Sequence, residues 1–215
     1  MNLLKYRLQQ SWLWLCTVIF VISSSVCLTF IGSLLLYPFD ISYLHLLNIV
    51  QIDPTTLLHN YHQLLAYLFC PWLTHLQMTN FPSSLQGLAH FASVKQLLLI
   101  NNIALIITGC FTDCFWHYLR QRHQLWRLLY PAEGLLMILV TIMFLMMSNF
   151  DRFFVIFHKL LFHNQDWLFD PNTDPIINVL PTQFFEQCFI VFGVLMLLWI
   201  VVGILIGKRC LRNKK

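Results

Sequence analysis

Two histidines stand at the ends of apolar segments, where an imidazole is well placed for acid–base chemistry. His90 comes just before one apolar run, in the segment GLAHFASVKQL, and His158 follows another, at the start of HKLLF. If both runs cross a membrane, the two side chains lie at one depth, where they could share a site. An imidazole with its unperturbed pKa of about 6.5 can take and return a proton at neutral pH. Each histidine alone is also compatible with ordinary packing at a membrane boundary.

The densest group of polar side chains lies between residues 150 and 185. Its members are Asp151, Arg152, Asn164, Asp166, Asp170 and Asp174. They form no single helical stripe, and Asp-Pro pairs at 170–171 and 174–175 mark turns. Charges among so many aromatic residues are costly unless they are paired. Either Arg152 pairs with a nearby aspartate and fixes this segment, or the charges orient a catalytic group.

Other catalytic signatures are absent from the sequence. There is no HExxH, GxSxG, Walker A or Rossmann motif, and the seven cysteines include no CxxC pair. His59 and His62 are spaced to share a helix face, but two such ligands are too few for a zinc site. We therefore expect neither a metal nor a cofactor.

The composition places the chain in a membrane. Hydrophobic residues make up 58% and charged residues 10% of the 215, and the mean hydropathy is +0.68. Soluble domains carry about 25% charged residues. So low a charge content argues against a soluble enzyme, a disordered chain, a secreted disulfide scaffold and a nucleic-acid binder. We expect one polytopic helical membrane domain over residues 1–215.

Charge-free windows locate four membrane-spanning helices, since about 20 mostly apolar residues cross the hydrocarbon core. The predicted spans are about 12–36, 94–112, 133–150 and 185–207. The first is expected to be a retained anchor, because its apolar run of about 25 residues exceeds that of a signal peptide. Lys95 is expected to snorkel outward from the second span.

The basic residues give the orientation. With four spans, ten of the thirteen Lys and Arg residues lie on one face, and only Lys95, Arg152 and Lys159 on the other. This positive-inside pattern puts both termini in the cytoplasm. Counting the apolar segment 57–73 as a fifth span would break the pattern, so we assign it to the exterior. Segments 37–93 and 151–184 would then form an extracellular cap of short helices and turns, because they carry most of the prolines.

The stretch 150–185 resembles the lipoprotein intramolecular transacylase (Lit) family of low-GC Gram-positive bacteria. The matching elements are the FDRFF start, Phe157-His158, Phe162, Asn164, Trp167, Asp170-Pro171, Asp174, Leu180-Pro181 and Phe184-Phe185. Two shorter patches also fit, namely Asn60-Tyr61 with Tyr67, and His90 with Val94-Lys95. The resemblance covers essentially the whole chain. It departs at Ser93, where the family pattern has aspartate, and this puts activity or substrate preference in question.

The resemblance implies a four-helix membrane fold with an extracellular cap and a cofactor-independent acyl transfer within one substrate. In diacylated lipoproteins, the acyl chain on the second glycerol carbon moves to the α-amine of the N-terminal cysteine, giving the lyso-form. The family's two catalytic histidines carry over to His90 and His158. The substrate would meet them at the extracellular face of the cell membrane, and no nucleic acid is expected as a partner.

These two histidines would share the roles of base and acid, without a sequence signal for which does which. We expect supporting or substrate-binding roles for a second group of side chains, namely Tyr61, Arg152, Asn164, Trp167 and Asp170. Tyr61 and Trp167, with Phe91, Phe154 and Phe157, are candidate walls of a water-poor pocket. Arg152 or Asn164 is a candidate donor to the oxyanion.

Three other functions remain open from the sequence. A non-enzymatic membrane scaffold or transporter partner would keep its function without either histidine. A transporter would need polar groups at mid-span, and Asn101, Asn102 and Thr141 are the main candidates. A different lipid acyltransferase or hydrolase would need a second substrate.

Overall fold

The structure is a computed structural model that describes residues 3–212, with side chains from residue 7 onward. Lys214, Lys215 and the side chain of Lys5, three of the predicted cytoplasmic charges, lie outside the described residues. The α-helices are α1 (Leu3–Tyr43), α2 (Pro54–Phe69), α3 (Leu85–Gln121), α4 (Leu129–Ser148), α5 (Phe150–Leu161) and α6 (Thr182–Arg212). Short 3-10 helices are η1 (Leu46–Asn48), η2 (Leu125–Leu128) and η3 (Pro175–Val179). The described chain contains no strand, which confirms the all-α class.

Four helical segments are long and apolar enough to cross a membrane, as the sequence predicts. They are Arg7–Tyr43, Leu85–Gln121, Leu125–Ser148 and Thr182–Arg212. Three of them run beyond both ends of the span predicted from charge-free windows, because flanking polar residues continue the helix. The remaining segment, the third, begins before its predicted span but ends at Ser148, two residues short of the predicted end. The segment 57–73 behaves differently, since α2 has only 16 residues and is not among the membrane-spanning candidates.

Local chemistry explains where α2 begins. Pro54 occupies the first helical turn, where its missing N–H costs nothing. The Asp53 carboxylate accepts hydrogen bonds from the backbone N–H groups of Thr55 and Thr56, each at 3.0 Å. These bonds, with those from the two threonine hydroxyls, hold the pKa of Asp53 well below its usual range. The helix therefore starts at a fixed point in the chain.

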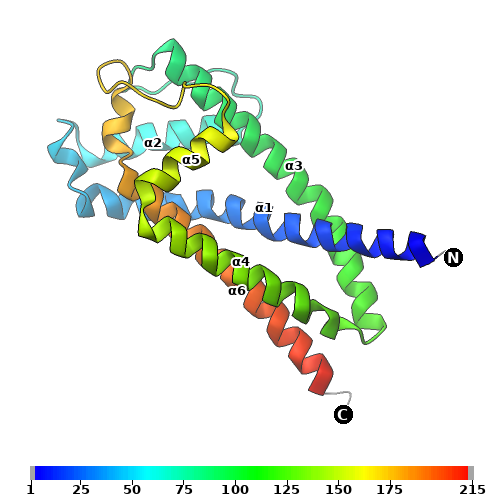
Figure 1. Cartoon of the computed structure of the whole chain (residues 1–215). Coiled ribbons are helices and arrows are strands. Elements are labelled where there is room, and N and C mark those ends of the chain that lie inside the picture. The colour runs from blue at the N-terminus through cyan, green and yellow to red at the C-terminus, as the bar shows by residue number, and fades with distance from the viewer. Residues whose placement is uncertain (1–2, 213–215) are drawn as a thin grey trace. The chain divides into compact units, whose positions relative to one another are not determined.

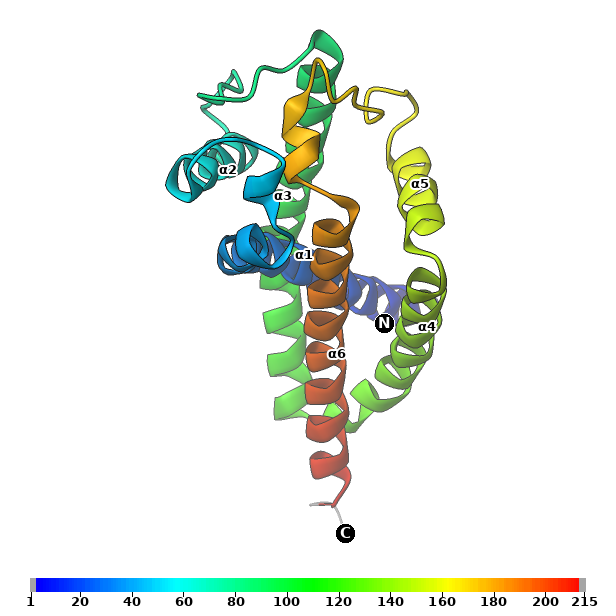
Figure 2. The same ribbon diagram turned by 90° about the vertical axis from the view of Figure 1, so that its left-hand side faces the viewer.

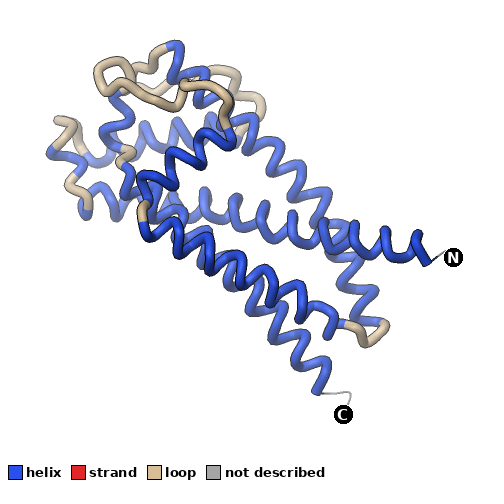
Figure 3. The backbone as a smooth tube through the Cα atoms, in the orientation of Figure 1, coloured by secondary structure: helices blue, strands red, loops and turns tan. Residues whose placement is uncertain are grey.

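The internal contacts divide the chain into two compact units. The first comprises residues up to 29, 101–145 and those from 190 onward, and the second comprises 30–100 and 146–189. Helices α1, α3 and α6 contribute to both, and the last three residues of α4 belong to the second. Figure 3 shows that the two long loops of the second unit, 70–84 and 162–174, follow α2 and α5.

In the first unit, α4 packs antiparallel against α6 through the glycines of α6 (Figure 1). A Cβ on Gly207 would lie 2.9 Å from Leu129 Cγ, and one on Gly203 would lie 3.9 Å from Ala132 Cβ. The two glycines form the GxxxG pair of the sequence, so small residues set this helix approach. The buried core beside them consists of Val21, Ala132, Leu139, Met196 and Ile200.

Polar residues of the first unit serve packing. The Asn101 side-chain amide donates to the Ser23 carbonyl across α3 and α1, at 3.2 Å. Thr141 donates to the Met137 carbonyl of its own helix at 2.9 Å. A polar side chain in an apolar helix can make its hydrogen bond either to a neighbouring helix or to the backbone of its own helix. Asn101 does the first and Thr141 does the second. The transporter alternative loses two of its three candidate mid-span groups.

In the second unit, α2 lies antiparallel to the C-terminal part of α1, as Figures 1 and 2 both show. Tyr37 and Tyr61 stack with ring centroids 4.0 Å apart. The Tyr61 hydroxyl donates to Ser33 Oγ at 2.6 Å, and the Tyr37 hydroxyl donates to the Val179 carbonyl at 3.0 Å. The tyrosine pair thus joins α1, α2 and η3.

The prediction that Lys95 snorkels outward is wrong. The side chain is 8% exposed, and its ammonium donates to the Cys70 carbonyl at 2.8 Å and to the Leu73 carbonyl. It also lies 4.3 Å from the centroid of the Tyr67 ring. The carbonyls at the end of α2 carry the negative end of the helix dipole, so they attract a cation inward. Lys95 therefore fastens the end of α2 to α3.

The approach of α4 to α6 predicts that Gly207→Ala lowers the stability of the protein. The added methyl would meet Leu129 Cγ at 2.9 Å and Cδ2 at 3.1 Å, and such overpacking costs about 1–3 kcal/mol. Gly134→Ala is the matched control, because a Cβ there has nothing within 4 Å. The control should be neutral or up to about 1 kcal/mol more stable, since alanine favours helix. Thermal unfolding in detergent measures both, and equal melting temperatures would contradict this packing.

Candidate active site

The structure brings His90 and His158 together. His90 lies in the second turn of α3, and His158 lies in the last turn of α5. Their ring centroids are 5.9 Å apart and their planes meet at 35°. The two side chains are 7% and 8% exposed. Two residues 68 positions apart in the sequence therefore form one buried pair of imidazoles.

Helix α5 presents His158 because its sequence is amphipathic. Asn149 caps the helix, and its side-chain oxygen accepts a hydrogen bond from the Arg152 N–H at 2.9 Å. Phe150, Phe154 and His158 are spaced four residues apart, so they lie on one face. The helix ends when the Phe162 N–H donates to the His158 carbonyl at 2.8 Å. His158 therefore lies at the C-terminal end of the α5 face that also carries Phe150 and Phe154.

One hydrogen bond determines the tautomer of His158. Its Nδ1 lies 2.8 Å from the Phe154 carbonyl oxygen, which can only accept. Nδ1 therefore carries the hydrogen in the neutral ring, and the lone pair is on Nε2. Burial lowers the pKa of His158 below 6.5, although the bond to Phe154 acts in the opposite direction. At neutral pH this ring is an uncharged base.

His90 lacks such a partner. Its Nδ1 is buried and makes no hydrogen bond among the described residues. An unpaired buried polar atom costs about 1–3 kcal/mol, so native proteins rarely keep one without a use. The nitrogen is free to bond a group that enters the site.

Aromatic rings surround the pair. Phe162 contacts both, with centroids 4.9 Å from His90 and 5.8 Å from His158. Trp167 lies 5.0 Å from His158, and Phe169 lies 5.4 Å from His90. The remaining ring neighbours are Phe91 beside His90 and Phe154 and Phe157 beside His158.

Phe169 was not anticipated from the sequence, because it falls in an irregular loop without periodicity. Trp167, Phe91, Phe154 and Phe157 were expected as walls and lie beside a histidine. Together these rings exclude water from most of both imidazole surfaces.

Asn164 and Asp170 shape the loop that carries Trp167. The Trp167 indole N–H donates to the Asn164 carbonyl at 3.1 Å. The Asn164 amide donates to Asp166 Oδ2 at 2.8 Å. The exposed Asp170 accepts bonds from the backbone and side chain of Asn172, both at 2.9 Å. Both residues therefore build turns, and neither contacts a histidine ring.

Arg152 and Tyr61 lie apart from the imidazole pair. Arg152 is exposed, and six residues along a helix place it about 120° around the axis from His158. Within residues 7–212 its guanidinium has no acidic partner, so of the two alternatives the pairing of Arg152 with an aspartate is not found. Tyr61 is 3% exposed, and its ring neighbours are Tyr37 and Phe184. Tyr61 thus supports the packing of α2 and is not a wall of the site.

Ser93 also takes no part in the contacts around the imidazoles. Its hydroxyl donates to the Ala89 carbonyl of the same helix at 3.0 Å. No carboxylate of the described residues bonds either histidine, so the only orienting partner is the carbonyl of Phe154. In addition, no group of three or more metal-ligating side chains occurs in the described part of the chain.

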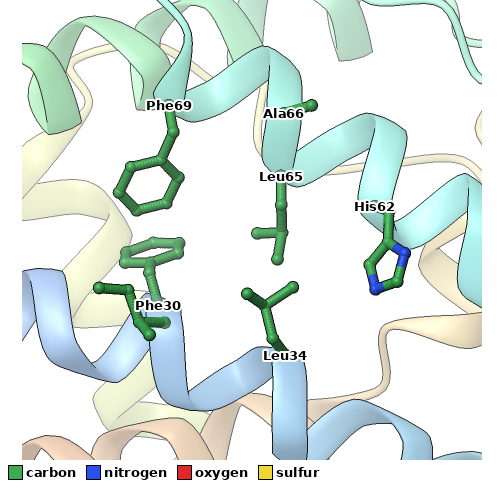
Figure 4. Close-up of a pocket in the computed structure, with 7 residues that line it drawn as sticks. Phe30, Leu34, His62, Leu65, Ala66 and Phe69 are labelled. Atoms are coloured by element: carbon green, nitrogen blue, oxygen red, sulfur yellow. The ribbon is translucent and has the colours of Figure 1, made fainter.

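A groove of about 480 Å³ lies between α1 and α2 in the same unit (Figure 4). Phe30 and Leu34 of α1 face Leu65 and Phe69 of α2, and His62 stands at one end. The lining is apolar apart from that histidine, and neither His90 nor His158 belongs to it. His62 therefore takes part in a surface different from the imidazole pair.

Comparisons with known proteins identify the family. No curated protein sequence gives a significant match. The family model described as lipoprotein intramolecular transacylase Lit matches residues 11–185. The in meso structure of the membrane-integral Lit from Bacillus cereus aligns with a TM-score of 0.81 and 26% identity, over 93% of this chain and 97% of that one.

A second structure of the Bacillus cereus protein, with a histidine replaced by arginine, has the same fold. It aligns with a TM-score of 0.79 and 24% identity, over 99% of this chain and 96% of that one. The family model covers most of the chain, and the structural alignment extends over nearly all of it. The chain therefore belongs to the Lit family of lipoprotein intramolecular transacylases and is a multi-pass membrane acyltransferase.

Proposed function

We propose that this enzyme moves an acyl chain within a diacylated lipoprotein, from the second glycerol carbon to the α-amine of the N-terminal cysteine. The product is a lyso-form lipoprotein, which is N-acylated and keeps one ester-linked chain. One observation carries the proposal. Two buried imidazoles lie side by side among aromatic rings, and the hydrogen bond of His158 leaves its Nε2 free to accept a proton.

His158 is the base in this reaction. The α-amine has a reference pKa of about 8, and its neutral form, which keeps a lone pair, is the nucleophile. As this neutral nitrogen attacks the ester carbonyl it becomes positively charged, and Nε2 of His158 takes one of its protons while Nδ1 keeps its bond to Phe154. General base assistance of this kind contributes about 10²–10⁴-fold to a rate.

His90 returns the proton to the substrate. The tetrahedral intermediate collapses when the bond between the carbonyl carbon and the glycerol oxygen breaks, and that oxygen needs a proton. His90 gives up its own ring proton there as it accepts one from His158, so both rings end neutral. The new amide bond replaces the ester bond, and no proton, electron or second substrate is consumed. The unpaired Nδ1 of His90 supports this role.

The aromatic surroundings suit a transfer that must avoid hydrolysis. Water in the site would compete with the amine for the ester carbonyl. The rings of Phe162, Trp167 and Phe169 cover the imidazoles, and their apolar faces suit lipid chains. Holding the amine and the ester at attack distance within one substrate supplies a further large part of the rate.

The site would lie at the extracellular face of the cell membrane. The positive-inside distribution of Lys and Arg supports cytoplasmic termini and an external position for the segments 37–93 and 151–184. Mature lipoproteins carry their lipid in the outer leaflet, so the substrate would reach the site from the bilayer. The short apolar helices α2 and α5 suit a position at the interface.

Mass spectrometry of a reporter lipoprotein tests the reaction. The host must lack N-acylating enzymes of its own, and the N-terminal lipopeptide is compared with and without this protein. We expect the fragmentation of an N-acyl S-monoacylglyceryl peptide at unchanged total mass. His90→Ala and His158→Ala should each lower the yield by about 10²-fold or more, because each removes one proton-transfer group.

His163→Ala is the matched control for this experiment, since His163 is exposed and follows the same helix. It should retain the activity of the wild type. The transacylase assignment would be contradicted if the wild-type protein is well expressed and the reporter nevertheless keeps its diacyl form with a free amine. Full transfer by both histidine variants would point to a scaffold role for the pair instead.

The burial of His158 predicts its titration. Because the folded state disfavours the charged ring, its midpoint should lie below the usual value of 6.5. The folded protein then binds fewer protons than the unfolded chain between these two pH values, so stability should fall as the pH drops below 6.5. Histidine-selective NMR in detergent micelles measures the midpoint, with His158→Gln used to assign the signal.

Trp167→Leu distinguishes burial from other causes of this shift. The variant removes the ring that lies 5.0 Å from His158 and should move the midpoint back toward 6.5. Trp72→Leu is the matched control, because Trp72 is 76% exposed and contacts neither histidine. A wild-type midpoint above 6.5 would contradict the assignment of His158 as a neutral base.

A further inference from the structure

A carboxylate outside the ring contacts of the imidazoles joins the loop 162–174 to the start of α3. Asp174 is 2% exposed, although aspartate is rarely buried without partners. Its Oδ1 accepts a hydrogen bond from the Ser84 backbone N–H at 2.8 Å. Its Oδ2 accepts from the Ser84 hydroxyl at 2.7 Å and from the Thr173 hydroxyl at 3.0 Å. These three bonds satisfy the buried charge.

The contact between Asp174 and Ser84 adds to the hydrogen bonds that cap the N-terminus of α3. Ser84 precedes the first residue of the helix, and its Oγ accepts from the Gly87 N–H at 2.9 Å. The same hydroxyl donates its proton to Asp174, so the backbone of α3, Ser84 and Asp174 form one chain of hydrogen bonds. A carboxylate at a helix N-terminus also meets the positive end of the helix dipole. Ser84 therefore caps a helix and is no nucleophile.

Gly87 provides the space for this carboxylate. A Cβ on Gly87 would lie 2.1 Å from Asp174 Oδ1 and 2.9 Å from Asp174 Cγ. No real side chain tolerates such an approach, so any other residue at position 87 would displace Asp174. Gly87 and Asp174 are far apart in the sequence, but the missing side chain of Gly87 makes room for the Asp174 carboxylate.

The same turn of α3 holds the loop at a second point. The Gln86 side-chain amide donates to the Gln165 carbonyl at 2.9 Å. Trp167 and Phe169 lie between Gln165 and Asp174, and they are the loop residues whose rings contact His158 and His90. Loop and helix are therefore joined on both sides of the two rings that cover the imidazoles.

We propose that Asp174 is a positioning residue of the acyl transfer, which fixes the loop 162–174 on the first turn of α3 so that Trp167 and Phe169 stay against the two imidazoles. The role rests on the proposed function. Asp174 itself contacts neither histidine and takes no part in bond making or breaking. It acts through the loop, because release of the carboxylate frees the segment that carries both rings.

Two substitutions break the contact from opposite sides. Asp174→Ala removes the carboxylate, and Gly87→Ala expels it while leaving it in the chain. Each should lower turnover by about tenfold to a hundredfold, as displacement of positioning groups by about 1 Å does. Asp174→Asn keeps an acceptor for the Ser84 N–H and should fall between Asp174→Ala and the wild type.

A second readout separates this role from a loss of folding. Diethyl pyrocarbonate acylates accessible neutral imidazoles, and peptide mass spectrometry reports the rate at each histidine. In the wild type, His90 and His158 should react far more slowly than the exposed His59. In Asp174→Ala and Gly87→Ala, both rates should rise toward that of His59, because the covering rings move away.

The matched controls carry the same chemical changes elsewhere. Asp113→Ala removes an exposed carboxylate from the same helix α3, and Gly134→Ala adds a methyl group to open space. Both should keep wild-type turnover and slow labelling of His90 and His158. If Asp174→Ala does not fold, turnover and histidine labelling of Gly87→Ala and of the conservative variant Asp174→Asn test the role of the contact.

Two results would overturn the proposal. The first is wild-type turnover with slow labelling in Asp174→Ala, and the second is lost turnover with both histidines still protected. Hydrogen exchange of the wild type supplies a test without variants, because rapid exchange of the Ser84 and Gly87 amides would also contradict the contact. If the wild type transfers no acyl chain, the proposed function fails, whereas labelling still reports on the loop.

Discussion

The constraint that governs the second unit is the placement of two basic rings away from water. Two imidazoles with centroids 5.9 Å apart cannot both be charged in an aromatic enclosure, because like charges repel and burial penalises each cation. At rest the two rings are therefore uncharged, and a fixed tautomer replaces fixed charge as the means of orientation. The Phe154 carbonyl supplies this for His158 without adding a charge of its own. Two charged side chains that the unit buries, Lys95 and Asp174, are held by partners outside the ring cluster.

Those buried charges lie where helices begin and end. Lys95 meets the carbonyls that follow α2, and Asp174 meets the donors that precede α3. Each position pairs a charge with the favourable end of a helix dipole and with unsatisfied backbone groups. The charges thereby fasten α2 and the loop 162–174 to α3, the helix that carries His90. The first unit is built differently, since small residues and apolar side chains hold its helices together.

The sequence predicts the helices better than the contacts between them. Apolar runs and missing charges define the four spans, because the membrane imposes their length and composition. The pairing of His90 with His158 follows from both residues standing at the ends of spans. Phe169 and the partnership of Gly87 with Asp174 escape prediction, because they depend on how an irregular loop folds back over 87 residues of chain. Lys95 was misjudged for a related reason, since its partners are backbone carbonyls, which leave no mark in a sequence.

The absence of an acid at position 93 agrees with this electrostatic design. In a Ser-His-Asp triad the aspartate stabilises an imidazolium that forms during the reaction. In this chain no carboxylate of the described residues bonds either histidine, and the only hydrogen-bond partner of the pair among them is the Phe154 carbonyl. Ser93 instead bonds to its own helix and leaves His90 surrounded by Phe91, Phe162 and Phe169. A neutral His90 can still relay a proton, because one ring nitrogen accepts as the other releases. In the proposed reaction the proton starts and ends on the same substrate, and orientation of the pair comes from packing and from a backbone carbonyl.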